Sequence, residues 1–204
     1  MDIKIISADD GATAYRQWNE VLKGNITEEY LMFTQPGIEG EKDAALPMAE
    51  EMAMAGADMV TAGYTLCYGD EILQESPEKV RRVFSGEDML CRIFYLQNEQ
   101  GFVFNKLFRT DIIKRFKLKF RTNIGAGAER LFLVNYLKRA ELVSMLPDHL
   151  MKWDLNITPP GYDKDTRKAF SIMRRALFFY GDAKYLCKMD MDYLKEEITE
   201  DEEV

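Results

Sequence analysis

Three polar side chains stand in apolar segments near the middle of the chain, where they could do chemistry. Asn105 and Lys106 interrupt the apolar run 102–108, and Glu129 opens the apolar segment that follows it. A positioned carboxylate can take a proton from a reacting hydroxyl, and an amide and an amine can line a binding cleft. A structural role is the alternative for each. Acidic residues favour the first turn of a helix, Asn105 could hydrogen-bond the backbone, and Lys106 could offset an acidic surface.

Cysteine and histidine residues limit the metal and redox chemistry. The three cysteines, Cys67, Cys91 and Cys187, are odd in number and widely spaced, and no pair has the spacing of metal ligands. We expect reduced thiols, which suit the cytoplasm better than a disulfide framework. The only histidine, His149, excludes any site that needs two histidines from one chain, and beside Trp153 it is expected to be structural or exposed.

Composition indicates a packed globular protein of 204 residues, with 47% hydrophobic and 12% aromatic residues. A net charge of -8 repels phosphate backbones, so we predict no nucleic-acid partner. No apolar run approaches the roughly 20 residues that a membrane-spanning helix needs, and the first residues lack the apolar core of a signal peptide.

Strands and helices are predicted to alternate along the first three quarters of the chain, which is typical of an α/β core. Expected strands are 3–7, 29–33, 57–68, 71–74, 102–108 and 142–146, and expected helices are 13–22, 43–55, 85–96, 110–116 and 128–140. A linker at 156–161 precedes two further helices, 163–180 and 182–195, and an acidic tail. We therefore divide the chain into an α/β domain, 1–150, and a helical appendage, 151–204.

Four blocks occur in an order that resembles family 2 of the inverting nucleotide-sugar glycosyltransferases, over roughly residues 20–147. They are Glu-Tyr-Leu-Met-Phe at 29–33, Ala-Asp-Met-Val at 57–60 with Gly-Tyr at 63–64, Asn-Lys-Leu-Phe-Arg at 105–109 and Gly-Ala-Glu-Arg at 127–130. The resemblance implies a GT-A type fold, which is a mixed, mostly parallel sheet flanked by helices. It also implies a nucleotide-sugar or a glycan acceptor as ligand.

The metal motif of the family is missing from its expected position. Family members carry an Asp-x-Asp sequence after the strand that 29–33 resembles, and its carboxylates hold Mg²⁺ or Mn²⁺ against the donor diphosphate. Hard cations of this kind need oxygen ligands such as carboxylates. Here the position reads Thr34-Gln-Pro-Gly37, and Glu39 and Glu41 follow only after the turn. We therefore predict no metal and no cofactor.

The base position is altered as well. The family supplies its general base from a Glu-Asp pair at a helix start, and the resemblance places Ala128 and Glu129 there. Glu129 keeps the charge but adds a methylene, and a misplacement of about 1 Å can cost about 10²-fold in rate. The sequence Ser-Gly-Glu-Asp at 85–88 matches the motif better but precedes the Asn105 block, so we expect Ser85 to be a helix N-cap instead.

The resemblance also implies that the nucleotide-binding half of the family domain is missing, since only about 28 residues precede Glu29. A sheet incomplete on this side would expose an edge, and exposed edges are normally paired or covered. We expect a paired strand in a homo-oligomer, or cover from the C-terminal helices.

Together these features predict a glycosyltransferase-like domain without independent catalysis, which serves as a sugar-binding, acceptor-binding or protein-interaction module. The alternative is an active inverting transferase with a non-standard donor site. In that case Glu129 would be the base, Asn105 and Lys106 would bind substrate, and Mg²⁺ or Mn²⁺ would be needed.

Overall fold

The protein folds around one mixed sheet of eight strands. The computed structural model describes residues 1–77, 79–93, 101–125, 127–157 and 172. The strands are β1 (Ile3–Ser7), β2 (Tyr30–Thr34), β3 (Ile38–Glu39), β4 (Met59–Tyr68), β5 (Glu71–Glu75), β6 (Arg82–Ser85), β7 (Lys106–Arg109) and β8 (Leu142–Asp154). The helices are α1 (Ala14–Lys23), α2 (Glu41–Ala55), α3 (Gly86–Arg92), α4 (Thr110–Arg115) and α5 (Gly127–Leu137), with a short 3-10 turn at Gly11–Thr13.

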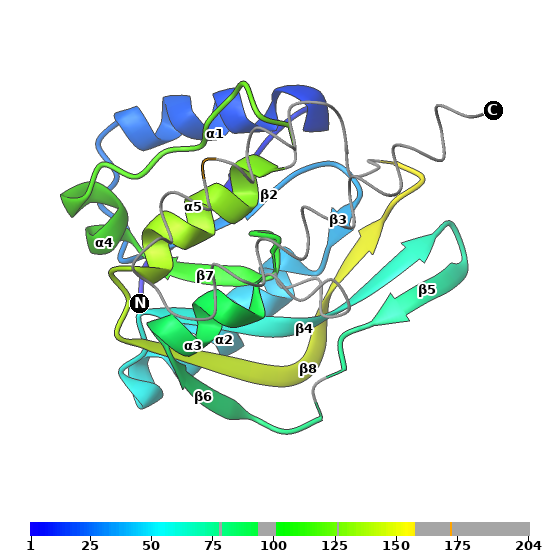
Figure 1. Cartoon of the computed structure of the whole chain (residues 1–204). Helices are drawn as coiled ribbons and strands as arrows, with labels where there is room; N and C mark the ends of the chain where they lie inside the picture. The colour runs from blue at the N-terminus through cyan, green and yellow to red at the C-terminus, as the bar shows by residue number, and fades with distance from the viewer. Residues whose placement is uncertain (78, 94–100, 126, 158–171, 173–204) are drawn as a thin grey trace.

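The strands lie side by side in the order β1-β2-β7-β4-β8-β3, with β5 added to β4 and β6 added to β8 (Figure 1). The pairs β1–β2 and β4–β8 are parallel, and β7 is antiparallel to both β2 and β4. The strands β1, β2, β4 and β8 therefore all point the same way, with β7 inserted against them. The predicted α/β class, with a mixed sheet flanked by helices, is confirmed.

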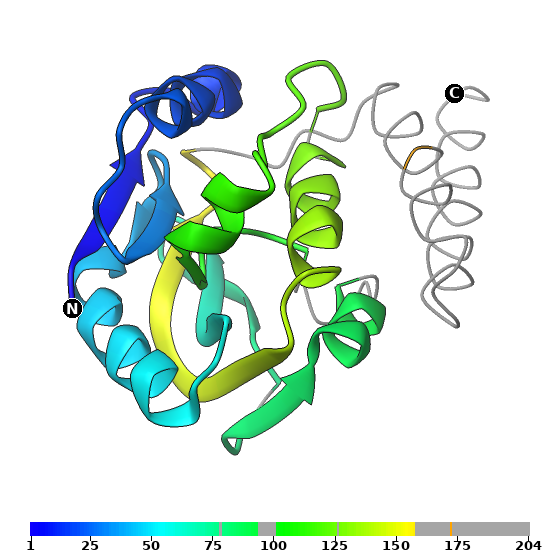
Figure 2. The same ribbon diagram turned by 90° about the vertical axis from the view of Figure 1, so that its left-hand side faces the viewer.

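Helices cover both faces of the sheet and divide the core into two clusters (Figure 2). On one face lie α1, α3, α4 and α5, with α3 against β6, β8 and α5, and among the described helices α2 covers the other face. The first cluster is dominated by stacked and edge-on rings of Trp18, Phe33, Phe108, Phe120 and Phe132, with centroids 4.3–5.7 Å apart where they pair. Aromatic pairs in this geometry add to the stabilisation from burial alone, and they hold α1 and α5 firmly in place.

The strands predicted at 102–108 and 142–146 differ most in extent from the observed ones. The strand expected at 102–108 begins only at Lys106, because Lys106 N–H bonds back to the carbonyl of Val103 and closes a turn. The strand expected at 142–146 instead continues to Asp154. Proline cannot donate a hydrogen bond to the ladder. The register between β4 and β8 shifts on either side of Gly63, and the ladder absorbs Pro147 at this irregularity.

The sheet therefore extends past residue 150, since Tyr64 and Leu66 of β4 pair with Met151 and Trp153 of β8. The predicted helices 163–180 and 182–195 and the acidic tail lie outside the described residues. The division into 1–150 and 151–204 stays a prediction. In the part of the chain that the structure describes, no helix is long and apolar enough to cross a bilayer.

Candidate functional site

The helix α5 carries the predicted base position in its first turn. Ten of its eleven residues are buried, including Glu129, whose exposed fraction is 8%. Phe132 stacks on Phe120 and meets Phe33 and Phe108 edge-on, so the helix is anchored along its length. The orientation of Glu129 is therefore fixed by the core.

Both carboxylate oxygens of Glu129 are engaged inside the protein. The backbone N–H of Val103 donates to Oε2 at 2.8 Å, and the hydroxyl of Tyr15 donates to Oε1 at 3.2 Å. Glu129 thus ties together α1, the turn before β7 and α5. Burial, followed by the effect of Glu129, raises the pKa of Tyr15 well above its usual range, so its hydroxyl stays a donor. Tyr15 was not predicted as a partner of Glu129, because the two residues lie 114 positions apart in the chain.

Burial also shifts the proton equilibria of Glu129 and Lys106 toward their neutral forms. The pKa of Glu129 is raised to about 7 by desolvation, against the opposing effects of the Val103 and Tyr15 hydrogen bonds and of Lys106. The pKa of Lys106 is lowered to about 7 by desolvation, against the attraction of Glu129. Each group opposes the shift of the other, since Glu129 raises the pKa of Lys106 and Lys106 lowers the pKa of Glu129.

Asn105 and Lys106 are both fully buried. The Asn105 amide donates to the carbonyl of Ala62 at 2.8 Å and to the hydroxyl of Thr61 at 3.2 Å, and its oxygen accepts a bond from Lys106 Nζ at 2.8 Å. The expectation that Asn105 could bond the backbone is confirmed. The alternative that Lys106 offsets an acidic surface is wrong, because its amine lies in the core and not at the surface. Their role in binding substrate stays a prediction.

Replacing Lys106 with methionine is expected to change the pH dependence of stability. In the unfolded chain the lysine pKa is 10.5, and in the folded protein it is about 7. As the pH falls from 10.5 toward 7, the unfolded chain binds the proton first, so wild-type stability decreases. Lys106→Met lacks this loss. The free energy of unfolding of the variant, relative to that of the wild type, should therefore rise as the pH falls from about 9.5 to about 7. The rise should be up to about 1.4 kcal/mol per pH unit.

Urea denaturation of both proteins across this pH range measures the effect. Only the change in their difference with pH matters, because methionine also leaves Asn105 Oδ1 without its Lys106 bond and this adds a constant cost. Lys152→Met, which removes a half-exposed lysine amine, serves as the matched control. If the stability difference from the wild type changed as little with pH for Lys106→Met as for Lys152→Met, the lowered pKa of the buried Lys106 amine would be contradicted.

The segment at the position of the family's metal motif forms part of the sheet. Ile38 and Glu39 pair with Trp153 and Lys152 of β8, and the carbonyl of Gly37 accepts a bond from Asp154 N–H at 2.7 Å. The side chain of Glu39 is 67% exposed and lies 3.9 Å from the Lys152 amine. Residues 34–37 offer no carboxylate, so this segment does not fit a divalent cation. Within the described ranges no three His, Cys, Asp or Glu side chains are grouped to hold a metal.

The carboxyl end of β2 is also closed from the other side. The Thr34 carbonyl accepts bonds from the Trp18 indole at 3.1 Å and from Ala8 N–H at 3.0 Å. Trp18 itself is almost fully buried. The helix α1 therefore seals the strand end from which the resembled family presents its metal ligands. A helix over 13–22 was predicted, but the contact of Trp18 with the end of β2 was not.

The remaining candidates have ordinary structural roles. Ser85 caps α3, since its hydroxyl accepts a bond from Asp88 N–H at 3.1 Å, as predicted. His149 is an exposed residue whose side chain is 24% exposed, with one ring nitrogen 3.3 Å from the Ser76 carbonyl oxygen and the other 3.5 Å from Glu75. His149 also lines an open hollow of about 500 Å³ between the β4–β5 hairpin and β8.

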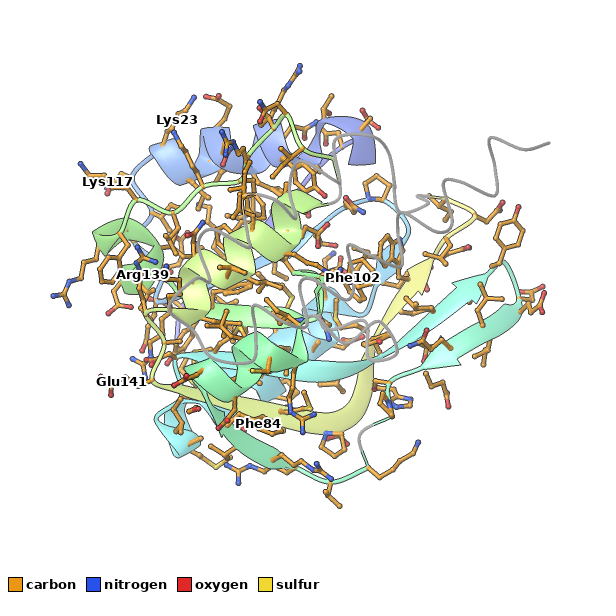
Figure 3. All side chains as sticks on the ribbon, viewed as in Figure 1. Lys23, Phe84, Phe102, Lys117, Arg139 and Glu141 are labelled. Atoms are coloured by element: carbon orange, nitrogen blue, oxygen red, sulfur yellow. The ribbon has the colours of Figure 1, made fainter. Side chains whose placement is uncertain are left out.

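Phe102, labelled in Figure 3, packs edge-on against Trp153 at the end of β8.

Comparison with known proteins defines the class of fold. No protein-family profile and no curated protein sequence matches the chain. Among solved structures, residues 1–349 of S. aureus TarS match with a TM-score of 0.60 and 15% identity, over 89% of this chain and 49% of that one. The same protein in complex with UDP-GlcNAc matches with a TM-score of 0.63 and 14% identity, over 86% and 50%.

The chain therefore has the GT-A-like α/β fold of a glycosyltransferase. It spans about half the length of the TarS 1–349 chains that it matches. At this level of identity the likeness establishes the fold and no particular activity.

Proposed function

We propose that this chain is a glycosyltransferase-like domain that does not complete sugar transfer alone and serves as a sugar-binding, acceptor-binding or protein-interaction module. The observation that carries the proposal is the engagement of Glu129. Both of its oxygens accept bonds from within the protein, from Tyr15 and Val103, and the side chain is 8% exposed. A general base must reach the hydroxyl whose proton it takes, directly or through one water.

The segment at the metal position supports the same proposal. A transferase that relies on a cation needs carboxylates against the donor diphosphate. In this chain residues 34–37 provide none, and Ile38 and Glu39 are committed to pairing with β8. We infer that any nucleotide-sugar contact here is made without a metal held by this segment.

The second candidate is an active inverting transferase with Glu129 as base, and one observation favours it. The raised pKa of Glu129, about 7, is suited to a group that exchanges protons near neutral pH. Asn105 and Lys106 would then hold substrate, after an opening of the core that exposes them. Mg²⁺ or Mn²⁺ would have to be bound through a partner or through the donor itself.

Titration calorimetry with UDP, UDP-GlcNAc and GDP-sugars, each with and without Mn²⁺, tests the proposal together with an assay of UDP release. We expect no UDP release by the isolated chain and no gain in nucleotide binding on adding Mn²⁺. UDP release that depends on Mn²⁺ and is lost in Glu129→Gln, with thermal stability retained, would establish the second candidate. Glu87→Gln, a change at an exposed acid in the first turn of α3, is the matched control.

A further inference from the structure

The strand β1 ends the sheet on one side. It pairs in parallel with β2 along its whole length, from Ile3 opposite Tyr30 to Ser7 opposite Thr34. It is the terminal strand in the order of the sheet, and in Figure 2 it lies at the outer margin of the molecule. Among the described residues no strand pairs with its other side.

The unpaired backbone groups of β1 can be assigned residue by residue. The carbonyl of Asp2 accepts bonds from Glu29 and Tyr30 N–H, and Ala8 N–H donates to the Thr34 carbonyl. Both residues therefore point their backbone groups at β2. Successive residues of a strand alternate in direction, so Lys4 and Ile6 also face β2. The N–H and C=O groups of the intervening residues, Ile3, Ile5 and Ser7, face outward.

This strand has little of the usual protection of a sheet edge, since its one charged side chain, Lys4, is engaged with Glu28. Natural edges carry proline, a bulge, or a charge that points into the approach path. The register of β1 with β2 is regular, the strand contains no proline or glycine, and the amine of Lys4 is held 3.2 Å from Glu28. Ile3 and Ile5 pack toward the α2 core and Ile6 toward the other core. Apolar residues on both faces are typical of an interior strand.

We propose that β1 pairs antiparallel with β1 of a second copy of this chain, about a two-fold axis at Ile5. In this register Ile5 lies opposite the partner's Ile5, and Ile3 lies opposite the partner's Ser7. All three outward-facing residues then exchange both backbone bonds with a residue that also faces outward. A two-fold contact uses the same edge on both copies and closes on itself, so it yields a dimer.

The side chains fit this register. Lys4 lies opposite the partner's Ile6, and Asp2 lies opposite the partner's Ala8, so no like charges are placed directly across the axis. Like charges in that position would be destabilising. Moving the axis to Lys4 brings Lys4 opposite the partner's Lys4 and leaves Ser7 without a partner in the strand. A register with Ile5 opposite the partner's Lys4 would instead point backbone groups that are already bonded to β2 at the partner. A shift of the axis to Ile3 leaves Ser7 unpaired. This pairing does not depend on the proposed function, because only β1 and its neighbours take part in it.

Light scattering coupled to gel filtration of the full chain, with sedimentation equilibrium, tests the proposal through one pair of variants. Ile5→Pro deletes the outward N–H and leaves the bonds to β2 in place, since edge positions of this kind tolerate proline. Ile5→Ala removes the same side-chain contacts but keeps the N–H. We expect a wild-type dimer, a dimer for Ile5→Ala, and a dissociation constant raised at least about tenfold for Ile5→Pro, which deletes two symmetric hydrogen bonds.

If Ile5→Pro fails to fold, the variant Ile5→Cys tests the pairing by disulfide formation. Directly opposed residues of a hydrogen-bonded antiparallel pair have Cα atoms about 5.5 Å apart, within the range that a disulfide spans. Mild oxidation of Ile5→Cys should link two copies through residue 5, as identified by peptide mass after digestion. A monomeric wild type at micromolar concentration would overturn the proposal. A wild-type dimer that forms no link through residue 5 would overturn it equally, by showing that the interface lies elsewhere.

Discussion

Replacing Glu129 with alanine is expected to lower the free energy of unfolding by about 2–5 kcal/mol, because each buried donor that loses its acceptor costs about 1–3 kcal/mol. The change leaves the Val103 N–H and the Tyr15 hydroxyl without their acceptors. It also removes the carboxylate that attracts the buried Lys106 amine. The measurement is urea denaturation near pH 7, followed by the fluorescence of Trp18 and Trp153.

Two companion variants separate the causes of that loss. Tyr15→Phe removes a single hydrogen bond to Glu129, so we expect a smaller loss of about 1 kcal/mol. Glu87→Ala removes an exposed acid from the first turn of another helix and controls for the favourable interaction of acids with helix N-termini. If Glu129→Ala cost no more than Glu87→Ala, the carboxylate would not be a structural link. The case for a catalytic carboxylate would then be stronger.

Most of the order of elements was predictable from local signals, although the strands β3 and β6 were not predicted. Ser85 followed by acidic residues indicated a helix start, and this cap is observed. These signals are local because caps and positive φ angles are decided by neighbouring residues. The full length of β8 was not predictable, since Pro147 and His149 interrupt its apolar pattern. The partner strand β4 accommodates these two residues through an irregular register near Gly63. Such a register depends on both strands together, so it cannot be read from the pattern of one.

The candidate site shows a similar limit. The sequence singled out Glu129, Asn105 and Lys106, and the structure brings all three into one buried region linked by the turn at Val103. What the sequence could not supply is the direction of each side chain. Tyr15 completes the Glu129 contacts from another helix. Burial of Lys106 follows from where its backbone lies in the sheet, between β2 and β4.

Under the proposed function, these contacts explain how a glycosyltransferase-like fold can be stable without independent catalysis. The positions that would carry ligands in the resembled family make structural contacts in this chain. Glu129 clamps three segments, and the segment after β2 pairs with β8. Substitutions that restored carboxylates at residues 34–37 would therefore have to compete with that pairing. We infer that recovering a metal site requires freeing this segment as well as changing its residues.

Gly40 shows how tightly that segment is held, and its replacement with alanine is expected to cost about 4 kcal/mol or more in unfolding free energy, a loss that is exceptional for one methyl group. Two effects combine. Its φ of +92° is unfavourable for any residue with a Cβ, and an added Cβ would overlap the backbone carbonyl oxygen of Leu150 in β8. A backbone oxygen cannot move aside without displacing β8 and the start of α2.

Gly56, at the other end of α2, supplies the matched control. Its φ is +63°, and an added Cβ would meet no heavy atom within 4 Å. Gly56→Ala therefore carries the cost of the backbone conformation alone, about 1 kcal/mol. The difference between the two variants in urea denaturation isolates the contact with β8. Losses that agreed to within about 0.5 kcal/mol would mean that this contact opens at little cost. The segment between β2 and α2 would then be able to rearrange around a ligand. Its pairing with β8 would no longer count against a metal site there.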